Sequence, residues 1–361
     1  MPKTYLYAEL LINIRQVTVF AILPSSCNEN TRIGLDAGHL ILHLTHDEKE
    51  SSITLPCPVV INNATLNLPL KPVTELSFRL GAATQLPPKA EVCNANSMPW
   101  PASKLTSETR VSCQSCGNQL ITNVTDWKDL PSGGWADMMD FWHCHKPTTE
   151  NGNHDTAGST KGYAAANILG PTPGVGLVDT SHFLLAETNC IGIRREADQK
   201  LLSCESCREP VGVVDREYGN IRLFKWSLAV QRSQDTVWET YSVPEIVSAQ
   251  LLALITELSI YKFLVNSGNT EERKETLLLW VFTPDLMYST STQLPQRAMK
   301  IFYISIADPA AILEHQNNKT EELQLPHHAI TALHTSLKAS TTTLPPSAQH
   351  HQTWTIGLLP R

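Results

Sequence analysis

Two pairs of cysteines, each spaced as Cys-x-x-Cys, most constrain the fold of this 361-residue chain. Cys113 and Cys116 form the first pair, and Cys204 and Cys207 form the second. Zinc prefers four ligands in a tetrahedron, and two such turns together supply four thiolates. We therefore predict one structural Zn²⁺ held by these four side chains. Four thiolates leave no coordination position open for a substrate, so this metal would stabilise the fold.

The distance in sequence between the two pairs is unusual for a small zinc finger. It is similar to the arrangement in β-tent zinc folds, in which two Cys-x-x-Cys hairpins from distant segments converge. Two alternatives remain open, a redox-active Cys-x-x-Cys pair and buried free thiols. A redox motif belongs next to a βαβ pattern, whereas these pairs lie among strand-like runs.

Composition limits the partners and the compartment. The net charge is −7, whereas nucleic-acid-binding proteins normally carry an excess of basic residues, so we expect no direct binding to nucleic acid. No apolar run has the length of a membrane span, and the first residues lack a signal-peptide pattern, so we expect no membrane partner. Four of the nine cysteines lie in Cys-x-x-Cys pairs, which indicates metal binding in a reducing compartment. We expect a cytoplasmic or nuclear protein.

The predicted fold class is α+β, with a β-rich N-terminal part, a central zinc-binding β region similar to a β-tent, and an α+β C-terminal region. Residues 1–83 contain short strand-like runs and are expected to form a β-sandwich. Residues 84–110 are rich in proline and indicate a linker or a surface excursion. The zinc-binding region is expected over 111–230 with a mobile insert at 146–180, and the C-terminal region over 240–361.

Individual elements follow from periodicity and from turn residues. Apolar residues at three- and four-residue steps predict a helix that begins at Pro244 and ends before Gly268. A second helix is expected over 327–337. Strands are expected at 5–12, 16–23, 40–44, 53–55, 73–80, 277–282, 300–306 and 354–359.

The segment DWKDLPSGGWADMMDFWHCHKP, residues 126–147, lies between the cysteine pairs. Helical spacing of its Trp and Met residues predicts a short amphipathic helix that ends at His143-Cys144-His145, before Pro147. Three interpretations stay open. The segment packs with Trp135 and Trp142 as core anchors, or Cys144 or His145 ligates a metal. Alternatively, Cys144 is a nucleophile whose pKa a protonated imidazole lowers.

Five segments carry a resemblance to a known family: CQSCGNQL at 113–120, LPSGGWADMMDFWHCHKP at 130–147, LLSCESCREPVG at 201–212, LLLWVFTPDLMYST at 277–290 and RAMKIFYISI at 297–306. Together they resemble the HECT-like ubiquitin-conjugating-enzyme-binding proteins, which are atypical ubiquitin-protein ligases. The resemblance extends over most of the chain. It implies that the chain binds a ubiquitin-conjugating enzyme and promotes the transfer of ubiquitin to lysines of a protein client.

The resemblance also implies roles for single residues. Cys113, Cys116, Cys204 and Cys207 correspond to the two knuckles of the family, and Trp142, Cys144 and His145 correspond to its W-x-C-H element. A HECT ligase carries a catalytic cysteine near its C-terminus, but this chain has no cysteine after Cys207. Cys144 is therefore the candidate catalytic residue, unless another upstream thiol serves or the transfer has no covalent intermediate.

Two other functions remain as alternatives. The first is a non-catalytic, zinc-stabilised interaction protein that stabilises one client. Members of the family have been associated with the mRNA 3′-end processing machinery, which would supply such a client. The second is a thiol redox protein.

Overall fold

The computed structural model describes residues 4–60, 72–83, 98–130, 170–195, 201–214, 219–232, 236–268, 276–306 and 320–361. These residues form mostly strands, with two α-helices, α4 Val243–Leu258 and α6 His327–Thr341, so the predicted α+β class is confirmed. The chain divides into two compact units. Unit 1 comprises Met1–Ser97 and Ile260–Arg361, and unit 2 comprises Met98–Ser259. Neither helix has the length and the apolar character that a membrane span requires.

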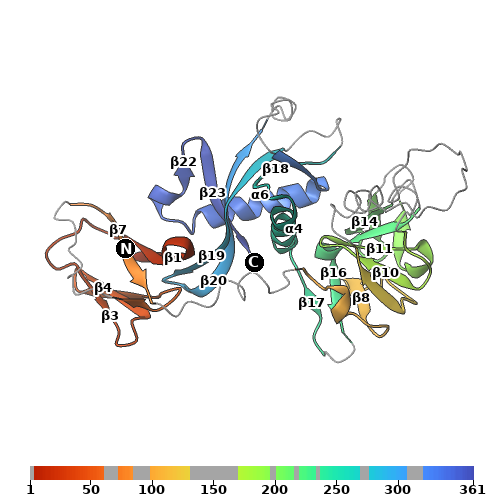
Figure 1. Ribbon diagram of the computed structural model, residues 1–361, viewed down its shortest axis with the longest axis horizontal. Helices are drawn as coiled ribbons and strands as arrows, with labels where there is room; N and C mark the ends of the chain where they lie inside the picture. The colour runs from red at the N-terminus through yellow and green to blue at the C-terminus, as the bar shows by residue number, and fades with distance from the viewer. Residues whose placement is uncertain are drawn as a thin grey trace, which may run out of the picture. The chain divides into compact units, whose positions relative to one another are not determined.

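Unit 1 is built on one long sheet that contains both ends of the chain (Figure 1). Its order is β22-β23-β20-β19-β1-β2-β7-β6, and β18 joins β19 to β21. The two ends of the chain were predicted to lie in separate regions. In the structure β1 pairs antiparallel with β19, with Leu10 opposite Met287, a contact between distant segments that no local pattern reveals. The strands are β1 Tyr5–Leu11, β2 Gln16–Ile22, β6 Val59–Val60, β7 Glu75–Ala82, β18 Lys262–Asn266, β19 Leu277–Thr290, β20 Gln293–Ser305, β21 Thr320–Gln324, β22 His350–His351 and β23 Trp354–Pro360.

A second sheet of unit 1 consists of β3 Arg32–Leu35, β4 Ile41–His46 and β5 Lys49–Thr54. Its inward side chains, Leu42, Leu44 and Ile53, share one core with residues of β1, β2 and β7. Alternating burial along β4 reflects this arrangement, because successive side chains of a strand point to opposite faces.

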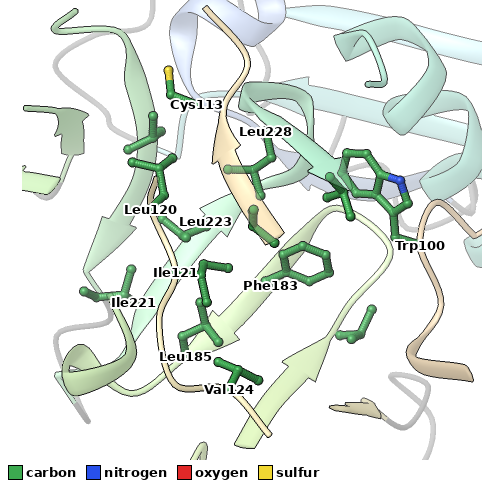
Figure 2. Packing of buried hydrophobic residues seen from close by; sticks show 14 of the residues in the cluster. Trp100, Cys113, Leu120, Ile121, Val124, Phe183, Leu185, Ile221, Leu223 and Leu228 are labelled. Atoms are coloured by element: carbon green, nitrogen blue, oxygen red, sulfur yellow. The ribbon is translucent and has the colours of Figure 1, made fainter. Parts of the chain in front are cut away.

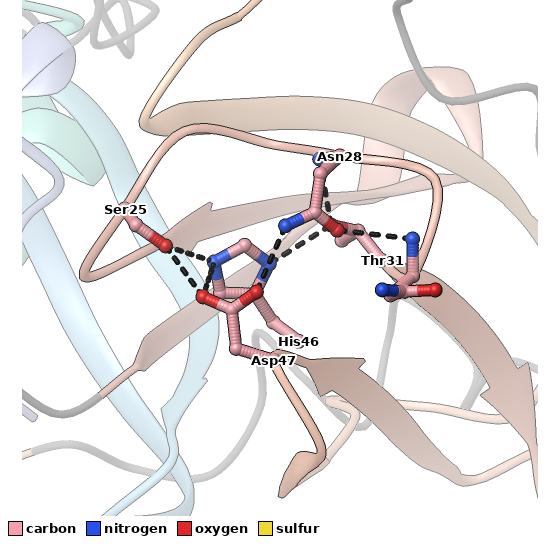
Figure 3. A network of polar contacts seen from close by, with 6 residues as sticks. Ser25, Asn28, Thr31, His46 and Asp47 are labelled. Atoms are coloured by element: carbon pink, nitrogen blue, oxygen red, sulfur yellow. Dashed lines mark hydrogen bonds and ion pairs between the residues drawn. The ribbon is translucent and has the colours of Figure 1, made fainter.

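A network of polar contacts links the loop that precedes β3 to the end of β4 and to the turn between β4 and β5 (Figure 3). The His46 ring is buried, and both of its nitrogens contact hydroxyl groups. Nε2 lies 2.7 Å from Ser25 Oγ, and Nδ1 lies 2.8 Å from Thr31 Oγ1. Ser25 Oγ donates to Asp47 Oδ2 at 2.7 Å, and Asn28 Nδ2 donates to Asp47 Oδ1 at 2.8 Å. Every polar atom of the imidazole is thus satisfied, as burial requires.

The helix predicted from Pro244 ends earlier than expected. It begins at Val243, one residue before the predicted Pro244, and Ser242 and Glu245 form a capping box at its start. It stops at Leu258, where Ser259 adopts a left-handed conformation with φ 55°, and β18 follows. The apolar run in β18 fits a helical period as well as a buried strand, and pairing with β19 and β21 decides the outcome.

Unit 2 contains a seven-stranded sheet of order β12-β13-β14-β15-β11-β10-β9 and a three-stranded sheet of order β17-β16-β8. One apolar core lies between them (Figure 2), and Cys113 and Cys204 belong to it. The strands are β8 Arg110–Cys113, β9 Asp126–Asp129, β10 Val175–Val178, β11 His182–Leu185, β12 Ile193–Arg195, β13 Leu201–Cys204, β14 Pro210–Val214, β15 Ile221–Phe224, β16 Leu228–Gln231 and β17 Glu239–Thr240.

Two segments, one predicted as a linker or surface excursion (84–110) and the other as a mobile insert (146–180), contribute side chains to this core. Residues 98–110 are not a linker, because Trp100 and Leu105 are buried, and Trp100 Nε1 donates to Glu239 Oε2 at 2.9 Å. Within the insert predicted at 146–180, β10 pairs with β9 and β11, and Val178 is fully buried. A composition rich in proline and glycine therefore does not exclude burial of individual side chains, and in the second segment it does not exclude a regular strand.

The side chain of Lys225 is fully buried in the same core. Its Nζ donates to the carbonyl oxygen of Pro99 and lies 5.1 Å from the centre of the Phe183 ring. Burial lowers the pKa of this amine from 10.5 to about 7, although the charges of Asp179 and Asp129 act in the opposite direction. The hydrogen bond from this amine thus links the segment that contains Pro99 to the segment that contains Lys225.

Candidate metal centre

The two Cys-x-x-Cys pairs fold into the same backbone turn at the ends of two strands. Cys113 ends β8 and Cys204 ends β13. The N–H of Gly117 donates to the Cys113 carbonyl at 2.9 Å, and the N–H of Arg208 donates to the Cys204 carbonyl at 3.0 Å. Gly117 and Arg208 both have positive φ, 75° and 68°. This repeated conformation turns each chain sharply and brings both thiols of a pair to one side.

The four thiols converge, although the segments that carry them lie far apart in sequence. Cys113 Sγ lies 3.6 Å from Cys207 Sγ, and Cys116 Sγ lies 3.6 Å from Cys204 Sγ. All four sulfur atoms lie within 4.8 Å of one another. A regular tetrahedron with Zn–S bonds of about 2.3 Å has S···S distances of about 3.8 Å. Disulfides are excluded, since their S–S distance is about 2.05 Å. These four side chains could hold one metal ion such as Zn²⁺.

Burial is graded across the cluster. Cys113 and Cys204 are buried, Cys207 is partly buried and Cys116 is exposed. Burial raises the pKa of the Cys113 thiol to about 12, against hydrogen bonds from the backbone of Ser115 and Cys116. Four protonated thiols packed this closely gain little from one another, because a thiol is only a weak hydrogen-bond donor and acceptor. A divalent cation would deprotonate them and use the amide hydrogen bonds that the turns already supply.

Cys204 is the thiol best prepared for ionisation. Burial acts to raise its pKa, but N–H groups of Cys207 and Ser206 and the side chain of Asn118 lower the pKa to about 7. Asn118 Nδ2 lies 3.6 Å from Cys204 Sγ and also donates to the carbonyl oxygen of Gly192 at 3.2 Å. Hydrogen bonds of this kind stabilise thiolate ligands and orient them.

Asn118 and Gly192 are site residues that sequence reasoning missed. A Cβ atom on Gly192 would collide with the Asn118 side chain and would lie 2.7 Å from the Gln119 carbonyl oxygen, and its φ is +61°. Glycine is therefore required where this loop passes the first knuckle. The position of Asn118 two residues after Cys116 was the only signal in the sequence. Nothing in the sequence linked Gly192 to the site.

The other cysteines do not join this cluster among the residues that the structure describes. Cys27, Cys57 and Cys190 are free thiols elsewhere in the two units. Burial raises the pKa of Cys57 to about 11, and burial together with the charge of Glu187 raises that of Cys190 to about 12. Such thiols remain protonated and unreactive near neutral pH.

The His-Cys-His segment lies outside the described residues, which end at 130 and resume at 170. The structure therefore places neither Cys144 nor His145 relative to the metal cluster. The packing roles predicted for Trp135 and Trp142 also remain predictions.

Comparisons with known proteins identify the family. The HECT-like ubiquitin-conjugating enzyme (E2)-binding family matches residues 9–356. An uncharacterized protein of Saccharomyces cerevisiae is 26% identical over 267 residues, 72% of this chain and 71% of the relative. An uncharacterized protein of Schizosaccharomyces pombe is 22% identical over 328 residues, 86% of this chain and 90% of the relative. No solved structure matches. Because the family match covers nearly the whole sequence, this chain belongs to the HECT-like ubiquitin-conjugating-enzyme-binding family.

Proposed function

We propose that this protein is a ubiquitin-protein ligase that binds a ubiquitin-conjugating enzyme and promotes transfer of its ubiquitin to lysines of a protein client. The observation that carries this proposal is the family match over residues 9–356, which supports a conjugating enzyme as partner. The match covers segments of both units, so both are expected to be needed for activity.

The mode of transfer depends on whether a thiol of this chain accepts ubiquitin. Two of the described thiols outside the metal cluster, Cys57 and Cys190, offer little support, since their pKa values are raised. Cys144 is the remaining candidate with histidines beside it in sequence. In the covalent mode its thiolate attacks the thioester carbonyl on the conjugating enzyme and releases the enzyme's thiolate. A client lysine amine then attacks the new thioester and releases Cys144.

A discharge assay tests this function. Conjugating enzymes loaded with ubiquitin are mixed with the full chain, and loss of their thioester is followed with time. Faster discharge with a reducible ubiquitin adduct that Cys144→Ala abolishes supports the covalent mode. Faster discharge without an adduct supports catalysis by positioning the loaded enzyme. No acceleration with any conjugating enzyme refutes ligase activity and favours the non-catalytic, client-stabilising alternative.

We also propose that the ion in the four-cysteine cluster is Zn²⁺ and that its role is structural. Four sulfur ligands in a tetrahedral arrangement are the donor set that zinc prefers in sites that stabilise a fold. Metal analysis of pure, reduced protein should find one zinc per chain. Reduced cysteines also fit a cytoplasmic or nuclear location, which imaging of the tagged chain would test.

A further inference from the structure

A groove that is separate from the four-cysteine cluster lies in unit 1, between α6 and the ends of β20 and β23. It has a volume of about 380 Å³, and its walls include Tyr303 and Ser305 of β20, His334 and Lys338 of α6, and Thr355 of β23. The helix and the strands therefore face one another across a space that a small ligand can enter.

At the floor of the groove α6 and β23 lie side by side (Figure 1), and hydrogen bonds join the C-terminal part of the helix to the strand. Thr341 Oγ1 donates to the Ile356 carbonyl at 2.7 Å, and the N–H of Leu358 donates to Ser340 Oγ at 2.8 Å. Gly357 permits this approach, since a Cβ atom there would lie 2.8 Å from the Leu337 carbonyl oxygen. The groove is thus preformed, and a ligand would not have to order it.

Two buried aromatic side chains line the inner surface of the groove. Tyr303 is 4% exposed and His334 is 8% exposed, and their rings meet edge to face with centres 5.9 Å apart. The hydroxyl of Tyr303 lies 3.2 Å from Thr341 Oγ1. Because the Thr341 proton is directed to a backbone carbonyl, the Tyr303 hydroxyl donates to Thr341. This chain of contacts fixes the imidazole in the wall of the groove.

Three of the remaining polar groups of the groove, on Ser305, Lys338 and Thr355, are available to bind a ligand. Among the described residues, no carboxylate pairs with Lys338, and no protein group accepts from the hydroxyls of Ser305 or Thr355. These three donors come from three different elements and surround one space. The lining residues that the structure describes include no acidic side chain, although the whole chain has a net charge of −7.

We propose that this groove binds a phosphoryl group. Its donor set, one ammonium and two hydroxyls without a carboxylate, selects an oxyanion and disfavours a cation. A phosphoryl group carries three strong acceptor oxygens that point in different directions. Donors on opposite walls, Lys338 on the helix and Ser305 and Thr355 on the strands, match such a tetrahedral group better than a planar carboxylate.

The test is an NMR titration of the full, zinc-loaded chain with inorganic phosphate, with chloride at matched ionic strength as reference. Shifts should be confined to amides of the groove. Lys338→Ala should weaken phosphate binding about tenfold or more, as expected for loss of one charge-assisted hydrogen bond. Lys104→Ala, which removes an exposed lysine of unit 2, should leave the affinity unchanged. Thr355→Val should weaken binding without changing the melting temperature.

Parallel titrations with O-phosphoserine and acetate identify the source of the anion. Tighter binding of O-phosphoserine than of phosphate indicates a modified side chain, and equal or weaker binding indicates free phosphate. Acetate binding as tight as phosphate binding overturns the assignment to a phosphoryl group. Shifts spread over the surface, or equal losses in Lys338→Ala and Lys104→Ala, show binding by general charge and also overturn it.

Discussion

Replacing Lys225 with methionine tests how far burial in the core of unit 2 lowers the pKa of this amine, and how much stability the charged form costs. The variant keeps the length and flexibility of the side chain and removes the ionisable amine. It also leaves the carbonyl oxygen of Pro99 without its donor, which costs about 1–3 kcal/mol at every pH. The informative quantity is therefore the change in stability with pH, from which this constant loss cancels.

The sign and the size follow from the pKa values. The amine has a pKa of about 7 in the folded chain, against 10.5 ordinarily. Between these values the unfolded chain binds more protons than the folded chain, so stability rises with pH. At pH 7 nearly the whole loss of stability caused by burying the Lys225 amine is present. At pH 9 this loss is smaller, because more of the amine is neutral in the unfolded chain as well. Linkage gives a gain of about 2 kcal/mol between pH 7 and pH 9 that Lys225→Met lacks.

Urea unfolding of the wild type and the variant at pH 7, 8 and 9, both loaded with zinc, measures this gain. Groups common to both proteins contribute equally and cancel in the difference. Lys128→Met is the matched control, because Lys128 is exposed and should not alter the slope. Parallel stability curves for the wild type and Lys225→Met would refute the reasoning, since the amine would then have the same pKa in both states.

Three further changes probe the metal centre and the two cores. Cys207→Ser should lower the zinc content below one per chain and lower the melting temperature, whereas Cys190→Ser should preserve both; metal analysis and thermal unfolding decide. Gly212→Ala should destabilise unit 2 by about 2 kcal/mol or more in urea unfolding, because the new Cβ atom would collide with the carbonyl oxygen of Arg222. His46→Ala should cost about 1–3 kcal/mol of stability in unit 1, because it removes a buried imidazole together with its hydrogen bonds to Ser25 and Thr31, with unchanged zinc content. A melting temperature equal to that of the wild type would contradict either of these last two predictions.

Sequence patterns predicted the features that depend on local chemistry. The fold class, the start of α4 and most strands of unit 1 followed from periodicity and from turn residues. The convergence of Cys113, Cys116, Cys204 and Cys207 followed from the need of one ion for four ligands, and the sulfur positions agree with it.

Features that depend on contacts between distant segments could not be predicted in this way. The end of α4 is set by the pairing of β18, not by its own periodicity. Trp100 lies in a Pro-rich stretch, and only the sheet it packs against makes it a core residue. Gly192 lies at the candidate metal centre because its loop folds back beside Asn118. A single glycine in a loop does not predict such a contact.

The pairing of β1 with β19 has a consequence for biosynthesis. The ribosome makes about 5–20 residues per second, so roughly 10–60 s separate the synthesis of Leu10 from that of its partner Met287. During this interval β1 has an unpaired edge, which favours association with other chains. Unit 2, which is contiguous in sequence, can fold meanwhile. Newborn chains should therefore depend on chaperones until the last hundred or so residues emerge, and truncated chains should aggregate through their N-terminal strands.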